Sequence, residues 1–91
     1  MIEPVGVFVV TAHAASEIRR RGIDEAIVRQ VLATPGQRQS VRPGRDVLHS
    51  RFEIAGKWYL VRVFVDIDRM PAEVVTAYRT SKIDKYWSAE P

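Results

Sequence analysis

The sequence predicts an α+β fold in which two N-terminal helices pack on one face of a mostly antiparallel meander sheet of four to five strands. Residues 11–34 combine helix caps with apolar spacings of three and four, whereas from Gln37 onward apolar residues recur at every second position. Helices that precede antiparallel strands usually cover one face of their sheet. The 91 residues are 46% hydrophobic and 27% charged, which fits one domain over residues 1–91.

Both predicted helices begin and end at residues typical of helix boundaries. Thr11 is suited to cap the first helix through its hydroxyl, and Gly22 ends it. Asp24 caps the second helix, which Pro35 and Gly36 stop. The second helix carries an apolar stripe that we expect to face the core: Ile27, Val28, Val31 and Leu32.

Strands are expected over most of the remaining chain. A first strand at about Val5–Val10 precedes the helices, and later strands are expected at residues 38–41, 46–54, 58–65 and 73–79. Alternation assigns these side chains to the face under the helices: Leu48, Phe52, Ile54, Val61, Val63 and Val75. After the last strand, Ile83, Tyr86 and Trp87 have the spacing of a final helical turn docked on the body.

The opposite face of the predicted sheet mixes cations, hydroxyls and aromatic rings. It is expected to present His49, Arg51, Arg62, Thr76 and Tyr78 together with Trp58, Leu60, Phe64 and Val74. Single-stranded RNA is bound by such surfaces, because bases stack on rings and phosphates meet cations. The alternative is an ordinary outer face with cross-strand pairs such as Glu53 with Arg62.

A polar stripe is predicted on the first helix. His13, Glu17 and either Arg20 or Arg21 recur one helical turn apart. A histidine beside a carboxylate and a guanidinium is suited to general acid or base catalysis. The alternative is a histidine in the first turn that only makes local hydrogen bonds.

Several classes of protein lack support in the sequence. Without cysteine the chain has neither disulfides nor thiolate metal sites. It also has no phosphate-binding glycine loop and no nucleophile elbow, so nucleotide hydrolysis and acyl transfer are not supported. Asp66 and Asp68 lie in a predicted turn, where aspartates commonly shape the backbone. We therefore expect neither a metal site nor a cofactor.

Charge and hydropathy indicate the surroundings of the protein. A net charge of +3 and a pI of about 9.7 favour acidic partners such as nucleic acids. The longest apolar run, Val5–Val10, is too short to span a membrane and lacks the basic leader of a signal peptide. We therefore expect a cytoplasmic protein that does not engage a membrane.

Four segments carry a resemblance to a known family. They read HAASEIRRRGI, DEAIVRQVLATPGQ, KWYLVRVFVD and VVTAYRTSKIDKYW, and they lie within Ala12–Trp87. In these segments the sequence resembles the small bacterial proteins grouped as domain of unknown function 4258. Many members have an arginine four residues after the histidine, where this sequence has Glu17, so the role of that arginine does not carry over. His13 and Arg21 match the family pattern.

The order of elements is similar to that of the RelE-type and BrnT-type toxins of toxin–antitoxin pairs, which are metal-independent ribonucleases. This similarity implies a RelE/barnase-like fold, RNA as the substrate and an acidic antitoxin as a partner. The implied reaction is attack of the RNA 2′-hydroxyl on the adjacent phosphate, which gives a cyclic phosphate. It requires a base, an acid and cations near the phosphoryl oxygens.

The resemblance also implies roles for individual residues. The catalytic candidates are His13, His49, Arg51 and Tyr78, and the RNA-binding candidates are Arg21, Arg62, Arg79 and Lys82. If the two histidines lie on opposite sides of the sheet, only one of them belongs to the site. Two alternatives stay open: a module that binds nucleic acid without cleaving it, and a protein-interaction or oligomerising domain whose apolar patch is Trp58, Leu60 and Phe64.

Overall fold

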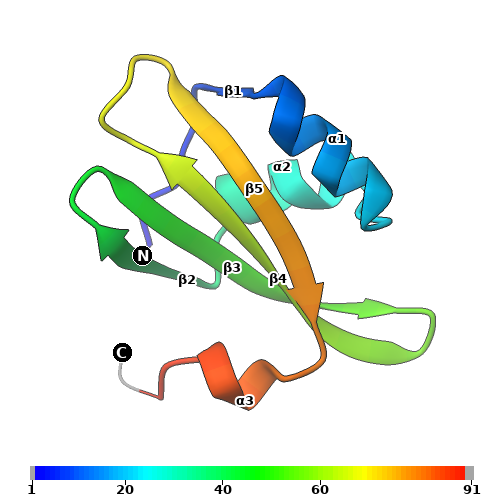
Figure 1. The fold of residues 1–91 in the computed structure, drawn as a ribbon. Coiled ribbons are helices and arrows are strands. Elements are labelled where there is room, and N and C mark those ends of the chain that lie inside the picture. Colours follow the sequence, from blue (N-terminus) through cyan, green and yellow to red (C-terminus); the bar gives the residue numbers. More distant parts are fainter. Residues whose placement is uncertain (1, 90–91) are drawn as a thin grey trace.

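The computed structural model of the chain describes residues 2–89, which form three helices and one five-stranded sheet (Figure 1). The elements follow in the order β1 (Phe8–Val10), α1 (Ala12–Arg20), α2 (Glu25–Ala33), β2 (Gln37–Arg42), β3 (Arg45–Ile54), β4 (Lys57–Asp66), β5 (Ala72–Thr80) and α3 (Ile83–Tyr86). The α+β class, the two helices ahead of the meander and the final helical turn are thereby confirmed. No helix within residues 2–89 is long and apolar enough to cross a membrane.

The two long helices begin where the sequence predicts. The Thr11 hydroxyl accepts a hydrogen bond from the Ala14 N–H (3.1 Å), and the Asp24 carboxylate accepts one from the Ala26 N–H (2.9 Å). Each bond satisfies a backbone donor that has no partner inside its helix. Gly22 follows α1 with a φ of 69°, a conformation that glycine adopts without steric cost.

The sheet is mixed, which corrects part of the prediction. Its strand order is β1-β5-β4-β3-β2. Strands β2 to β5 form an antiparallel meander, but β1 runs parallel to β5, with Phe8 opposite Ala72. Helices α1 and α2 and strands β2 to β4 separate β1 from β5 in the chain. Their pairing is therefore a long-range contact that local periodicity does not reveal.

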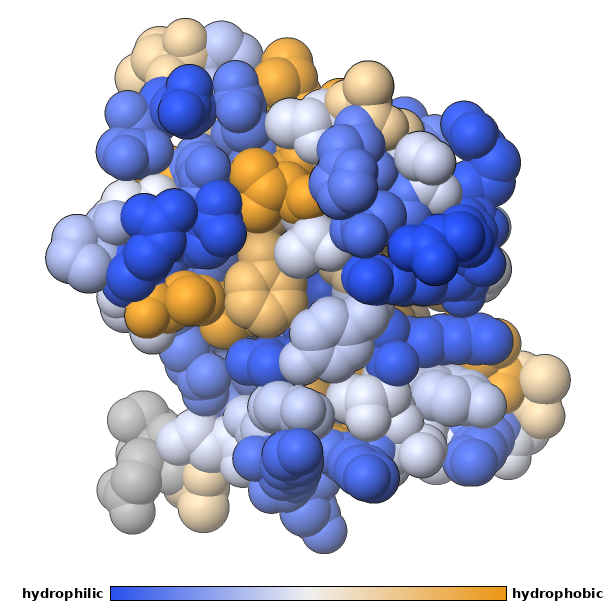
Figure 2. Space-filling model, in the orientation of Figure 1, coloured by the Kyte–Doolittle hydropathy of each residue, from blue (hydrophilic) through white to orange (hydrophobic). Residues whose placement is uncertain are grey.

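The hydrophobic core lies between the sheet and the two long helices. Its fully buried side chains include Ala14, Val31, Leu32, Leu48, Val61, Val63, Val65, Val74 and Ala77. In Figure 1, α2 lies behind the sheet, and the opposite sheet face is turned toward the viewer, with α3 near its lower edge. We call this opposite face the open face. Figure 2 shows apolar side chains near the middle of this view, with hydrophilic side chains around them.

A bulge in β5 overturns the predicted facing of Val74 and Val75. Val65 pairs with Val74, but Phe64 pairs with Thr76, so Val75 is an extra residue in β5. A bulge of this kind shifts the alternation of side chains by one position. Val74 is consequently buried in the core where Val75 was expected, whereas the prediction for Leu48, Val61 and Val63 is confirmed.

Candidate functional site

Four polar residues form a row across four neighbouring strands on the open face. Gln37 of β2 lies opposite His49 of β3, His49 lies opposite Arg62 of β4, and Arg62 lies opposite Tyr78 of β5. We call these four residues the polar row. Residues in register on adjacent strands have neighbouring side chains on one face. The antiparallel register therefore brings together three candidates that lie far apart in the sequence.

Hydrogen bonds connect the polar row from end to end. Arg62 Nε donates to His49 Nδ1 (3.3 Å), and His49 Nε2 lies 2.8 Å from Gln37 Oε1. Because a guanidinium only donates, Nδ1 is the acceptor, so the proton of the neutral ring is on Nε2 and is donated to Gln37. Arg62 also donates to the Tyr78 hydroxyl at 2.6 Å. These bonds fix the tautomer of the histidine.

The C-terminal segment, by which we mean α3 together with Trp87 and Ser88, covers the polar row. The Trp87 ring lies 5.6 Å from the His49 ring, and the Arg62 guanidinium lies 4.3 Å from the centre of the Tyr86 ring. Gln37 binds the backbone of Ser88 through two hydrogen bonds. Its amide oxygen accepts from the Ser88 N–H (3.0 Å), and its amide nitrogen donates to the Ser88 C=O (2.6 Å). As a result His49 is 0% exposed and Arg62 is 9% exposed.

Burial controls the protonation of the polar row. Removal of water, reinforced by the Arg62 charge, lowers the pKa of His49 to about 4. His49 is therefore neutral near pH 7. Burial also raises the pKa of Tyr78, whereas a hydrogen bond from Tyr78 lowers the pKa of Tyr86. The phenol of Tyr78 thus keeps its proton and sits beside a cation.

The polar row has the groups that phosphodiester cleavage needs, but it is closed. A neutral imidazole can accept a proton, a guanidinium can bind phosphoryl oxygens, and a phenol can donate a proton. Both ring nitrogens of His49 are engaged within the row, and Tyr86 and Trp87 lie over it. Access to these groups requires the C-terminal segment to move.

The predicted polar stripe on α1 is present but lies elsewhere. Glu17 is within 3.4 Å of His13 and within 3.6 Å of both Arg20 and Arg21. It also accepts a hydrogen bond from the Thr76 hydroxyl (2.8 Å), and this bond, with help from the cations, lowers the pKa of Glu17. His13 has a side chain that is 78% exposed. His13 belongs to this α1 cluster, while His49 belongs to the closed polar row.

The remaining candidates are divided among different surfaces. Arg21 donates to the Ala77 C=O (2.8 Å), so it satisfies a backbone acceptor of β5. Arg79 is in register with the core residue Val61, which places it on the helix side of the sheet, away from Arg62. Lys82 is exposed immediately before α3. Arg79 therefore does not share the face of the polar row, whereas Arg21 is engaged with β5 and with Glu17.

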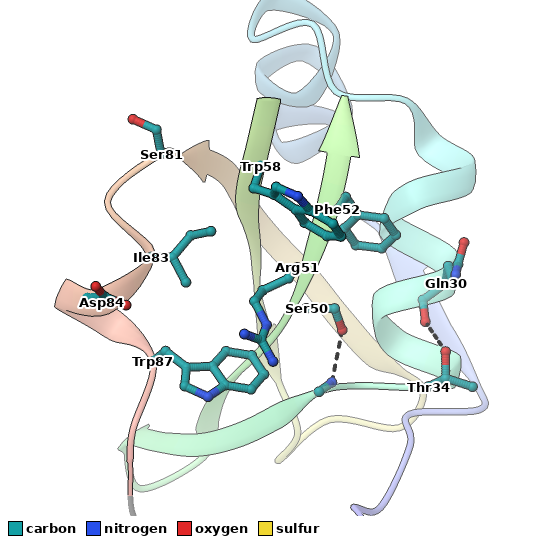
Figure 3. Close-up of a pocket in the computed structure, with 11 residues that line it drawn as sticks. Gln30, Thr34, Ser50, Arg51, Phe52, Trp58, Ser81, Ile83, Asp84 and Trp87 are labelled. Atoms are coloured by element: carbon teal, nitrogen blue, oxygen red, sulfur yellow. Dashed lines mark hydrogen bonds between the residues drawn. The ribbon is translucent and has the colours of Figure 1, made fainter. Parts of the chain in front are cut away.

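Arg51 lies in a groove of about 860 Å³ that adjoins the polar row. Its guanidinium is 4.3 Å from the centre of the Trp87 ring. Figure 3 shows Arg51 between Trp87 and Ser50, with Trp58 and Phe52 above it and Thr34, directly after α2, on the far side. Trp58 is 55% exposed. The groove therefore offers a cation and aromatic surface beside the covered row.

Two expectations for the open face are wrong. Glu53 lies opposite Trp58, and Arg62 lies opposite His49, so the expected pair of Glu53 with Arg62 does not form in this register. Leu60 is 0% exposed, which breaks the apolar patch predicted from Trp58, Leu60 and Phe64. The C-terminal segment and its neighbours bury part of the open face. Alternation along the strands does not predict this burial, because it only assigns side chains to one face or the other.

Sequence reasoning missed Gln37 and Gly36. Gln37 orients His49 and anchors Ser88, but a glutamine at the start of a weak strand gives no signal of that role. Gly36 was interpreted only as a helix stop. A Cβ atom at this position would lie 3.0 Å from the Trp87 ring and 3.2 Å from the His49 carbonyl oxygen. Glycine therefore lets Trp87 lie against the strand.

Asp66, predicted in a turn, is the last residue of β4 and is engaged with arginine. Arg45 Nε donates to Asp66 at 2.6 Å, and this bond lowers the pKa of Asp66. Within residues 2–89, no three histidine, aspartate or glutamate side chains gather in a way that could hold a metal ion. The Asp66 carboxylate thus joins β3 to β4 as half of an ion pair.

Comparison with known families gives one match. The model of the family described as a domain of unknown function (DUF4258) matches residues 10–80, which include α1, α2 and the whole sheet except part of β1. The matched range contains His13, His49, Arg62 and Tyr78 and stops before α3. Comparisons with curated proteins and with solved structures gave no match.

Proposed function

The chain belongs to the DUF4258 family, and from its geometry we propose that it is a small metal-independent ribonuclease, the toxin of a toxin–antitoxin pair. One observation supports this proposal above the others. His49, Arg62 and Tyr78, which come from three adjacent strands, form one hydrogen-bonded row. Imidazole, guanidinium and phenol are the groups that a metal-independent cleavage of RNA uses.

The proposed reaction assigns a role to each group of the row. His49 accepts the proton of the 2′-hydroxyl as its oxygen attacks phosphorus, and the bond from phosphorus to the 5′-oxygen breaks. Tyr78 gives its proton to that leaving oxygen, while Arg62 binds the phosphoryl oxygens on which charge grows. Arg51, next to the row, holds a neighbouring phosphate. The products are a 2′,3′-cyclic phosphate and a free 5′-hydroxyl.

Cleavage in this proposal requires the cover to open. Trp87 and Tyr86 shield the row in the structure, so the closed form is inactive and their displacement gives the active form. Trp87→Ala is expected to increase cleavage by about tenfold or more, because it populates the open form. Arg62→Ala in the same background is expected to remove the activity, because it deletes a phosphate ligand.

The experiment is incubation of purified protein with single-stranded RNA in EDTA, followed by analysis of the product ends. The wild type and the Trp87→Ala, Trp87→Ala/Arg62→Ala and Trp58→Ala variants are compared. Trp58 is the matched control because it is an exposed tryptophan of the same groove. Intact RNA with every variant, including Trp87→Ala, would contradict the proposal. Equal cleavage with and without Arg62 would contradict the assigned site.

A second candidate function is RNA binding without cleavage. It is favoured by the closed state of His49, whose nitrogens are both engaged inside the row. On this hypothesis the groove binds nucleic acid through Arg51, Trp58 and Trp87, and the row only stabilises the sheet. Salt-sensitive RNA binding by the wild type that Arg51→Ala weakens, together with uncut RNA in all variants, would select this function.

A further inference from the structure

The second half of β3 has an open edge. β2 begins at Gln37, opposite His49, and the N–H of the preceding Gly36 donates to the His49 C=O (3.0 Å). No residue of β2 therefore lies beside the part of β3 that follows His49. Alternate residues of a strand turn their backbone groups to the same side. The N–H and C=O groups of Arg51 and Glu53 therefore point to this edge, where no strand of residues 2–89 pairs with them.

The groove follows this open edge. Ser50, Arg51 and Phe52 all line it, although successive side chains of a strand point to opposite faces. Three consecutive residues line one groove when the groove runs along the edge of their strand. Thr34, directly after α2, lies on one side and Trp87 on the other (Figure 3). The space beside the edge is thus bounded on both faces of the sheet.

We propose that this groove binds an extended segment of a partner protein, which pairs with Arg51 and Glu53 as an additional strand beside β3. Backbone groups of an open edge bind a strand with regularly spaced hydrogen bonds, a common mode of peptide recognition. An uncovered edge with free backbone groups also favours pairing with another chain. RNA has no backbone that alternates donors and acceptors at the spacing of a strand, so the edge favours a peptide.

The side chains of the groove specify the chemistry of the segment. A residue that pairs with Arg51 places its side chain on the same face as the guanidinium. A carboxylate at that position would complement Arg51, the cation that lines the groove. The adjacent residue of the segment faces the Phe52 side, where an apolar side chain fits. The expected segment therefore alternates apolar residues with a carboxylate opposite Arg51.

Such a segment would also act on the polar row, provided that the proposed ribonuclease function holds. Trp87 forms a wall of the groove and also covers His49. A strand in the groove packs against Trp87 and keeps it over the row. The partner would then hold the enzyme closed, as expected of an antitoxin, without touching His49 or Arg62.

Amide hydrogen exchange of the full ¹⁵N-labelled chain tests the pairing directly. The probe is a synthetic acetylated and amidated peptide in which one glutamate stands among alternating valines and threonines. Bound peptide is expected to slow exchange of the Arg51 and Glu53 amides by about tenfold. The Ser50 and Phe52 amides point toward β4, so their exchange is the internal control. The same peptide methylated on its edge-facing nitrogens is expected to have no effect.

A pair of variants separates edge pairing from RNA chemistry. Glu53→Pro removes an edge N–H and is expected to abolish the slowing at Arg51, while Glu53→Val keeps the N–H and retains it. RNA cleavage by the Trp87→Ala protein is expected to be unchanged by either substitution. The proposal fails if no amide at the edge slows, if the methylated peptide works equally, or if oligouridine protects these amides and the peptide does not. Peptide protection without any RNA cleavage would reject only the ribonuclease function.

Discussion

At the scale of the residue, His49 is the most informative side chain. The sequence places a histidine on an alternating strand, which gives it an exposed position on the outer face. In the fold it is fully buried between Arg62, Gln37 and Trp87. In acid the histidine of the unfolded chain binds a proton, whereas the buried histidine of the folded chain stays neutral. This difference in bound protons makes the free energy of unfolding depend on pH.

Lowering the pH from 7 to 5 is expected to destabilise the protein by about 2 kcal/mol through His49. The folded pKa is about 4, so in this interval the unfolded chain binds a proton and the folded chain does not. Stability from this group is complete above the unfolded pKa and decreases as the pH falls toward 4. Denaturant unfolding of the wild type and of His49→Gln measures the effect. An equal loss of unfolding free energy between pH 7 and pH 5 in both proteins would show that His49 is not the source of the pH dependence.

At the scale of the element, the C-terminal segment depends on side chains for its position. α3 has four residues, none of them buried, and no side chain caps its N-terminus. So short a helix is not stable alone. Tyr86 and Trp87 attach it to the open face. An element held by a few side-chain contacts is well suited to move as a cover, unlike α1 and α2, which contribute to the core.

Gly36→Ala is expected to loosen this element. The added Cβ would stand 3.0 Å from the Trp87 ring and 3.2 Å from the His49 carbonyl oxygen, closer than packed side chains normally approach. We expect a loss of about 1 kcal/mol from overpacking and a rise in Trp87 fluorescence quenching by iodide. Gly6→Ala is the control, because a Cβ there meets nothing within 4 Å. Unchanged stability and quenching in Gly36→Ala would refute the close contact.

At the scale of the whole molecule, the sheet separates the basic residues. Arg51 and Arg62 lie on the open face, whereas Arg79 lies on the helix side. Arg20 and Arg21 lie beside Glu17. A net charge of +3 therefore does not describe a single basic surface. Contacts to RNA are expected to come from the few cations near the groove.

Binding of oligouridine is accordingly expected to depend on salt as it would for about two or three phosphate contacts, with affinity falling roughly tenfold between 50 and 200 mM salt. Arg51→Ala is expected to reduce the salt slope by about 0.7, the contribution of one phosphate of a single strand. Arg79→Ala is the matched control on the helix side. Fluorescence anisotropy titrations at several salt concentrations measure both slopes. Equal reductions in the two variants would argue against binding at the groove.

The sequence by itself determined the elements that local rules govern. Thr11 and Asp24 start helices because their side chains satisfy free backbone donors, and alternation correctly assigned Leu48, Val61 and Val63 to the core. These outcomes depend on neighbours within a few residues. The spacing of Tyr86 and Trp87 also predicted a last helical turn against the body, although it did not show what that turn covers.

Only the tertiary structure decided which of the candidate residues meet. The register of four strands joins His49, Arg62 and Tyr78, while it sends Arg79 to the other face of the sheet and leaves His13 on α1. The parallel pairing of β1, the bulge at Val75 and the start of β2 opposite His49 are likewise set by long-range packing. Such contacts join residues that are distant in the chain, so no local pattern in the sequence encodes them.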